Sequence, residues 1–110
     1  MRALACLLVA GLATPVAADR TYEGREAAAL RCANTVALTA VTMGRAGMIG
    51  DDQKGAMLGI SLLMLERHVS GTWTEKKRAL EIVRDRRSVE DTLEDYRRNA
   101  ARCLRDFPIN

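Results

Sequence analysis

Apolar residues recur every three to four positions along most of the chain, and this spacing predicts α-helices rather than strands. An alanine-rich stretch over about 22–43 carries small side chains at this spacing, which allow a neighbouring helix to approach closely. The stretch over 56–65 is almost wholly apolar, so we expect a buried helix there. It is too short to span a bilayer, which needs about 20 apolar residues.

Glycines and capping residues mark the expected helix ends. Three glycines over 44–50 predict a turn, after which Asp51 or Asp52 is expected to cap the second helix. Gly71 is expected to end that helix. Residues 72–75, Thr-Trp-Thr-Glu, then predict a capping box in which threonine and glutamate exchange hydrogen bonds with free backbone amides.

The last helix has the clearest amphipathic pattern. It is expected to begin after Ser88, and opposite charges at helical spacing, such as Glu94 with Arg98, predict solvated outer faces. Its apolar positions follow a heptad spacing suited to antiparallel packing: Val89, Leu93, Tyr96, Ala100, Cys103 and Phe107. Because three short connections make consecutive helices antiparallel neighbours, the sequence predicts an all-α, up-down-up-down four-helix bundle.

The N-terminus has the three-part pattern of a secretory signal peptide. A positive start, Met1-Arg2, precedes a short apolar run, and small residues over 16–18 form a cleavage site. We expect cleavage after Ala18, which divides the chain into a signal peptide over 1–18 and a helical bundle domain over 19–110. This predicts a periplasmic protein with no transmembrane anchor after cleavage.

Cleavage leaves two cysteines, Cys32 and Cys103, in a compartment that favours disulfides. The helix from Cys32 to the turn near Gly47 is about 22 Å long, and the helix from Cys103 back to Val89 is about 21 Å long. The cysteines are therefore expected at equal heights on adjacent antiparallel helices, joined by a bridge that closes a long loop. The alternative is two free thiols used for redox chemistry or metal, although the chain lacks a C-x-x-C motif.

Charge gives no argument for a nucleic-acid or membrane partner. The formal net charge is only +3, and Arg2 would be lost with the signal peptide. Basic and acidic side chains are interleaved over 74–106, which is typical of a solvated, salt-bridged face rather than a binding stripe. We therefore expect no nucleic-acid partner.

The sequence shows no recognisable catalytic arrangement. Ser61, Ser70 and Ser88 lie in no G-x-S-x-G motif, and His68 is the one histidine that could serve as a base. Acidic pairs such as Asp51-Asp52 are explained by helix caps. The glycines of the first turn do not match a phosphate-binding loop. We therefore expect a protein that is not an enzyme and carries no cofactor.

His68 also allows a second interpretation, as a metal or haem ligand. Met64 precedes it by one turn, Met57 lies two turns further back, and Met43 could face them from the first helix. Thioether sulfur with imidazole suits Cu(I). Because methionine commonly fills irregular cores, a structural role is the competing explanation. A Cu(I)- or haem-binding bundle remains an alternative function.

Large apolar side chains near the turns are candidates for contact with a protein partner. Trp73 lies beside a turn, and we expect it at the same end of the bundle as His68, Phe107 and Tyr22. Met48-Ile49 is an apolar pair in the glycine-rich turn at the other end. Each group could equally cover the core. The candidate binding residues are His68, Trp73, Met48 and Ile49.

The layout resembles a loose group of small exported two-cysteine helical proteins of Gram-negative bacteria, of unassigned function. The shared features are Leu30-Arg31-Cys32-Ala33, an apolar second helix that ends near Gly71, and Arg102-Cys103. The architecture is also similar to that of periplasmic acid-stress chaperones and of helical toxin-immunity proteins, which carry disulfides. We expect a non-enzymatic periplasmic protein that acts by binding another periplasmic protein, with an acid-stress chaperone or a toxin-immunity protein as alternatives.

Overall fold

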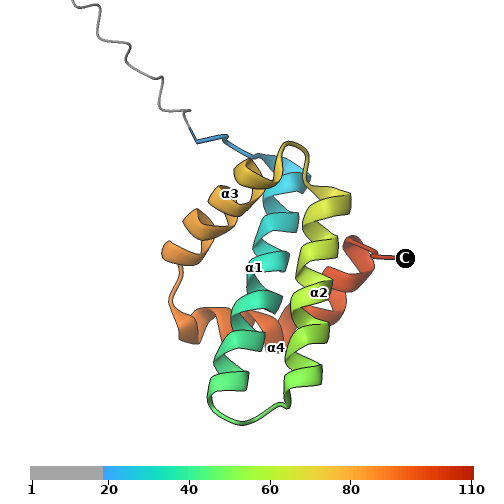
Figure 1. Cartoon of the computed structure of the whole chain (residues 1–110). Helices are drawn as coiled ribbons and strands as arrows, with labels where there is room; N and C mark the ends of the chain where they lie inside the picture. Colours follow the sequence, from blue (N-terminus) through green and yellow to red (C-terminus); the bar gives the residue numbers. More distant parts are fainter. Residues whose placement is uncertain (1–18) are drawn as a thin grey trace, which may run out of the picture.

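The computed structural model describes residues 19–110, so the predicted signal peptide over 1–18 lies outside the described residues. The described range contains four α-helices and no strand (Figure 1). The prediction of an all-α four-helix bundle with one disulfide is confirmed. The helices are α1 (Gly24–Arg45), α2 (Asp51–His68), α3 (Trp73–Asp85) and α4 (Val89–Asp106).

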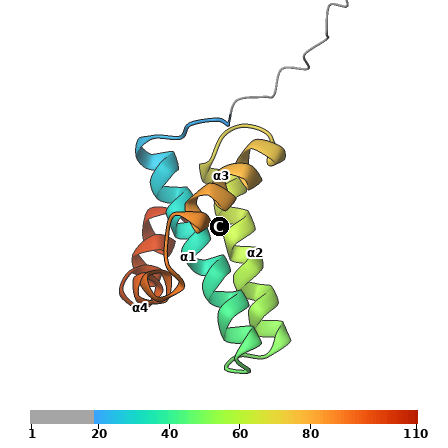
Figure 2. The same cartoon turned by 90° about the vertical axis from the view of Figure 1, so that its left-hand side faces the viewer.

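Helix α1 is the centre of the fold and packs against each of the other three helices. It forms an antiparallel hairpin with α2, and α3 lies against its N-terminal half (Figure 1). Helix α4 runs across α1 rather than along it: Figure 1 shows it from the side, behind the hairpin, and Figure 2 shows it nearly end-on. The arrangement therefore departs from four parallel columns in the placement of its last helix.

The crossing of α4 has a physical basis in which of its apolar residues are buried. Cys103 and Phe107 lie in the core, whereas Val89 is 42% exposed at the other end of the helix. The heptad stripe is therefore fully buried only toward its C-terminal end, where α4 meets α1; Leu93, Tyr96 and Ala100 are partly buried. A helix that buries one end of its stripe does not need to lie alongside its neighbour.

The helix ends agree with the sequence at α3 and α4. Thr72 Oγ1 accepts a hydrogen bond from the Glu75 backbone N–H at 3.2 Å, and Glu75 Oε1 accepts one from the Thr72 N–H at 2.9 Å. This is the predicted capping box. Ser88 Oγ accepts from the Asp91 N–H at 3.0 Å, so Ser88 caps α4 as expected.

Both predicted ends of α2 differ from the structure. The N-cap residue is Gly50 with extended backbone, and Asp51 and Asp52 fall in the first helical turn. There they stabilise the helix by facing its positive end rather than by capping an amide. The helix ends at His68, and Gly71 lies beyond it with φ +99°, a backbone conformation that favours glycine.

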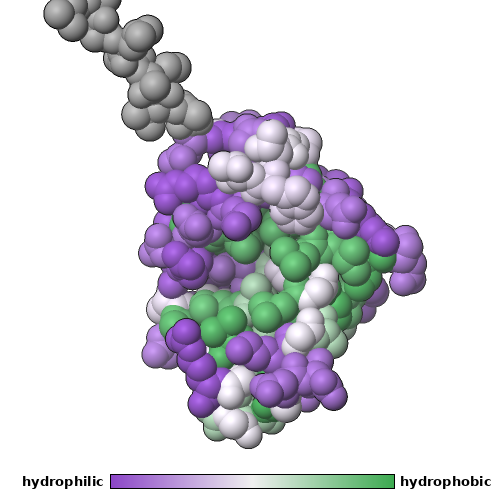
Figure 3. Space-filling model, viewed as in Figure 1, coloured by the Kyte–Doolittle hydropathy of each residue, from purple (hydrophilic) through white to green (hydrophobic). Residues whose placement is uncertain are grey.

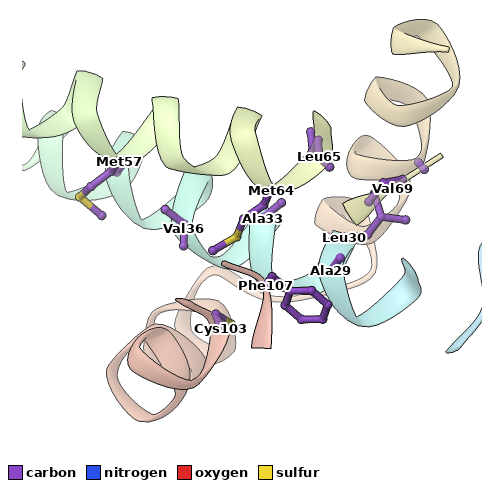
Figure 4. Packing of buried hydrophobic residues seen from close by; sticks show 12 residues of the cluster. Ala29, Leu30, Ala33, Val36, Met57, Met64, Leu65, Val69, Cys103 and Phe107 are labelled. Carbon is purple, nitrogen blue, oxygen red and sulfur yellow. The ribbon is translucent and has the colours of Figure 1, made fainter. Parts of the chain in front are cut away.

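The core lies where α2, α3 and α4 meet the alanine-rich half of α1 (Figure 4). Met64 and Leu65 are fully buried, and Ser61 Oγ donates a hydrogen bond to the Ala33 carbonyl at 2.7 Å. A serine at this point lets α2 approach the small side chains of α1. The buried apolar residues are Ala29, Leu30, Ala33, Val36, Ala40, Met57, Met64, Leu65, Val69, Ala79, Cys103 and Phe107.

The predicted bridge between Cys32 and Cys103 is present, with a Cα–Cα distance of 5.6 Å. It joins α1 to α4 where the two helices cross. The equal-height argument does not describe how the cysteines meet, because α4 does not run beside α1. The crossing point itself brings them together.

Candidate binding surface

A groove between α1 and α3 opens on the side of the hairpin away from α4. Its apolar lining comes from Leu38 and Val41 of α1 and from Leu80 of α3, and it encloses about 290 Å³. Arg45 and Arg84 stand at its rim. We call this the α1–α3 groove. It is large enough to receive apolar side chains from a second molecule.

Asn34 also lines the α1–α3 groove and is the polar group at its buried side. The Asn34 residue is only 2% exposed, and its Nδ2 finds no hydrogen-bond acceptor among residues 19–110. A buried donor without an acceptor is unfavourable by about 1–3 kcal/mol. The groove therefore combines apolar walls with an unpaired amide donor that lies just beneath its surface.

Helix α2 presents a second apolar feature on its outward side, which we call the α2 outer face: Gly55, Leu58, Gly59 and Leu62. Leu62 is 54% exposed, and Leu58 is partly buried against the core. A Cβ added at Gly55 or Gly59 would meet no atom within 4 Å. The prediction that this apolar helix is buried is therefore wrong along one face.

Helical geometry places the α2 outer face on the same side of the molecule as the groove. Met57 and Met64 extend toward α4 in Figure 4, whereas Leu65 lies near Leu30, which faces α3. Leu62 and Leu58 precede Leu65 by three and seven residues, so they continue its side of the helix. Figure 3 shows hydrophobic surface across the middle of this face of the hairpin, with hydrophilic surface over α3 and near the lower turn.

The predicted binding residue His68 is used inside the fold. Its Nε2 donates to the Pro108 carbonyl at 2.7 Å. Its ring packs edge-on against Phe107, with the ring centroids 5.4 Å apart. His68 thus fastens the C-terminal segment to α2.

Trp73 begins α3, at the other end of the α2–α3 loop from His68, and its side chain is exposed to solvent. It is nearly half exposed, and Lys76 Nζ sits 4.9 Å from its ring centroid. Tyr22 approaches the same loop, where its hydroxyl donates to the Ser70 carbonyl at 2.7 Å. The sequence predicted His68, Phe107 and Trp73 at one end of the molecule. His68 and Phe107 pack against each other there, whereas Trp73 is exposed.

Met48 and Ile49 occupy the α1–α2 turn at the opposite end. Met48 is 70% exposed, whereas Ile49 packs against the core. Gly47 takes a positive φ of +68°, which allows the tight reversal before them. Of the predicted pair, Met48 is the side chain available to a partner.

The residues proposed for a Cu(I) site are separated by their roles in the fold. Met64 and Met57 pack into the core, and His68 Nε2 bonds to the Pro108 carbonyl. Across residues 19–110, no group of three or more His, Cys, Asp or Glu side chains could hold a metal ion. In the same range, no helix has the length and hydropathy to cross a membrane.

A larger concavity of about 580 Å³ lies where α1 and α4 cross, with the disulfide in its wall. Arg31 lines it and pairs with Asp95 at 3.1 Å. Arg25 donates to the Asp106 carbonyl and lies 4.8 Å over the Phe107 ring. These guanidinium groups already have partners, so we do not assign a binding role to this concavity.

The sequence did not single out the groove or the α2 outer face. The four-residue spacing of Gly55 and Gly59, and of Leu58 and Leu62, was an available signal. It gains meaning only once α3 and α4 are known to leave that face open. Comparisons of the chain with known protein families, with curated proteins and with solved structures found no match.

Proposed function

We propose that this protein is exported to the periplasm and acts there by binding protein rather than by catalysis. The observation that carries the proposal is the apolar surface formed by the α2 outer face and the α1–α3 groove. Leu62 is more than half exposed there, beside a groove lined by Leu38 and Leu80. Contiguous exposed apolar surface on a small domain is typical of an interaction site.

Export is supported by two independent features. Residues 1–18 have the signal-peptide pattern, and the Cys32–Cys103 bridge fits an oxidising compartment. The partner would then also be found in the periplasm.

Binding is favoured over catalysis because the polar side chains that could do chemistry have structural partners. His68 holds the Pro108 carbonyl, and Glu26 accepts a hydrogen bond from the Ser70 N–H at 2.9 Å. The Ser70 hydroxyl and that backbone bond lower the pKa of Glu26 below its usual value, as expected of a carboxylate with a structural role. Acid-stress chaperones and toxin-immunity proteins also act by binding, so both alternatives fall within the proposal.

Fractionation and site-directed crosslinking test the two halves of the proposal. The mature chain should appear in the osmotic-shock fraction with a mass that begins at Asp19. A photo-crosslinking amino acid at Leu62 should give a discrete protein adduct in living cells. The same group at Arg97, an exposed residue on α4, is the control and should give none. A cytoplasmic chain with an intact leader, or equal crosslinking from both positions, would refute the proposal.

A further inference from the structure

We infer that the α2 outer face and the α1–α3 groove form the contact between two copies of this chain. The inference rests on the proposed function, because it names the partner of the same surface. In this arrangement α2 of each copy lies in the α1–α3 groove of the other.

The first argument is the pair of glycines inside α2. Gly55 and Gly59 lie in the helix interior, where glycine is less favourable than alanine. The fold of one chain does not require them, because a Cβ at either position would meet no atom within 4 Å. Bare backbone allows another backbone to approach closely, so the glycines are explained by a helix that packs from outside.

The second argument is that this face carries both a ridge and a groove. Leu62 projects from α2 with Leu58 partly exposed beside it, and Leu38, Val41 and Leu80 line the hollow. Two-fold symmetry needs a surface that is complementary to itself. A ridge next to a groove meets that requirement, because one rotation places each ridge over the other copy's groove.

The third argument is charge at the end of the hairpin. A Cβ at Gly44 would lie 2.9 Å from the Lys54 side chain, and Ser61 bonds to the Ala33 carbonyl. These contacts set Arg45 level with Asp51 and Asp52. A two-fold axis parallel to α1 keeps these heights, so Arg45 of one copy faces the two aspartates of the other.

The charge pattern also favours a two-fold axis parallel to α1 over one perpendicular to the helices. Asp51 and Glu66 lie one turn beyond Gly55 and Leu62 on the outer face, and both are exposed. An axis perpendicular to the helices would pack α2 on α2 and bring Asp51 of one copy toward Glu66 of the other. Like charges at a contact are unfavourable. The parallel axis instead gives four antiparallel helices, two from each copy.

The groove supplies one further group that a second copy could satisfy. Asn34 Nδ2 is buried there without an acceptor among the described residues. The uncovered backbone around Gly59 presents carbonyl oxygens, each with a lone pair that can accept a second hydrogen bond. Once the Asn34 amide turns outward, a helix with exposed backbone supplies the acceptor that it lacks.

The first experiment is sedimentation equilibrium on the oxidised protein from its native compartment, between 1 and about 500 μM, a range that covers affinities typical of small interfaces. We expect a monomer–dimer equilibrium. Leu62→Glu should weaken dimerisation at least tenfold, which corresponds to about 1.4 kcal/mol. Leu104→Glu is the control, since Leu104 is an apolar α4 residue with 43% exposure outside this face. A monomer throughout, or equal effects of the two variants, would overturn the inference.

Two further variants keep the test decisive if Leu62→Glu fails to fold. Gly59→Ala should stabilise α2 in dilute monomer and weaken the dimer, two effects of opposite sign. Arg45→Asp should weaken the dimer, and adding Asp51→Arg and Asp52→Arg should restore it. Failure of the charge reversal to restore dimerisation would contradict the proposed axis.

Crosslinking from Leu62 separates this inference from the proposed function. An adduct of two identical chains supports both. A monomer that crosslinks to a different periplasmic protein overturns the dimer and keeps protein binding. A monomer with no adduct overturns both.

Discussion

Arg31 Nε donates to Asp95 Oδ2 across 3.1 Å, immediately beside the residue that forms the disulfide with Cys103. Asp95 Oδ2 also lies 3.4 Å from an Arg87 nitrogen, and Asp95 Oδ1 accepts from Asn99 at 2.7 Å. An ionic cluster and a covalent bridge therefore hold α4 at the same crossing. Since α4 packs chiefly on α1, these links largely determine where it lies.

The disulfide should be the largest single contribution to the position of α4. In the chain-entropy model, removing it with Cys32→Ser and Cys103→Ser lowers the free energy of unfolding by about 4 kcal/mol. Urea unfolding of the oxidised wild type and the double variant measures this difference. Reductant should destabilise the wild type and leave the double variant unchanged.

The loss of stability on removing the disulfide should also be concentrated in α4. Without the bridge, amide hydrogen exchange should rise more in α4 than in the α1–α2 hairpin, because the hairpin retains the contacts of Met64 and Leu65. Equal exchange in α4 and the hairpin would show that the bridge stabilises the whole domain rather than the crossing.

Asp95 should make stability depend on acidity. Its side chain is 10% exposed; burial raises its pKa, but hydrogen bonds from Arg31 and Asn99 and nearby positive charge outweigh burial and leave the pKa below the usual value. A carboxyl with a lowered folded pKa stabilises the fold above its unfolded pKa, about 3.9. That contribution is lost as pH falls through the folded pKa.

Asp95→Asn should therefore be destabilised relative to wild type by about 2 kcal/mol at pH 7. The difference should shrink once the pH falls below the folded pKa of Asp95, where the wild-type carboxyl is also neutral. Urea unfolding at pH 7 and across the acidic range measures it. Asp85→Asn is the control, because the Asp85 side chain is 65% exposed and, within residues 19–110, pairs only with its neighbour Arg84. A difference that does not change with pH would show that Asp95 acts through packing alone.

The capping box of α3 gives a simpler prediction. Thr72→Ala removes the acceptor for the Glu75 N–H and should lower the free energy of unfolding by about 1 kcal/mol. Thr74→Ala removes a hydroxyl of the same kind at the second residue of α3, where the N-cap position is already held by Thr72, and should be nearly neutral. Thermal unfolding compares the two variants. Equal losses would mean that Thr72 contributes by something other than its cap.

The capping box and the cysteine pairing could be predicted because both follow from local sequence or from a count. Thr72 and Glu75 are three residues apart, and two cysteines allow one intramolecular bridge. The predicted N-cap of α2 was wrong because an acidic residue stabilises a helix N-terminus either at the cap position or in the first turn. Asp51 therefore looked like a cap although Gly50 holds that place.

The placement of α4 and the binding surface could not be predicted in the same way. The heptad spacing from Val89 to Phe107 identifies the apolar positions of the last helix. It does not show how much of that stripe a neighbouring helix covers. In the same way, Met64 and Leu62 are both large apolar residues of one helix. Met64 is buried because it faces α1 and the core residues Val36 and Cys103, whereas no described helix covers Leu62.

The glycines of α2 and of the α2–α3 loop should respond to alanine in opposite directions. Gly59→Ala places a methyl group in open space on a helix and should raise the stability of dilute protein by about 1 kcal/mol. Gly71→Ala places a Cβ at φ +99°, 2.9 Å from the Tyr22 hydroxyl that bonds to the Ser70 carbonyl. It should lower stability by more than about 1 kcal/mol, because neither the backbone nor the neighbours accommodate it. Urea unfolding at low protein concentration measures both effects free of self-association. If Gly59→Ala were also destabilising in dilute protein, the glycine would be needed within one chain, and the argument that an external helix explains it would fail.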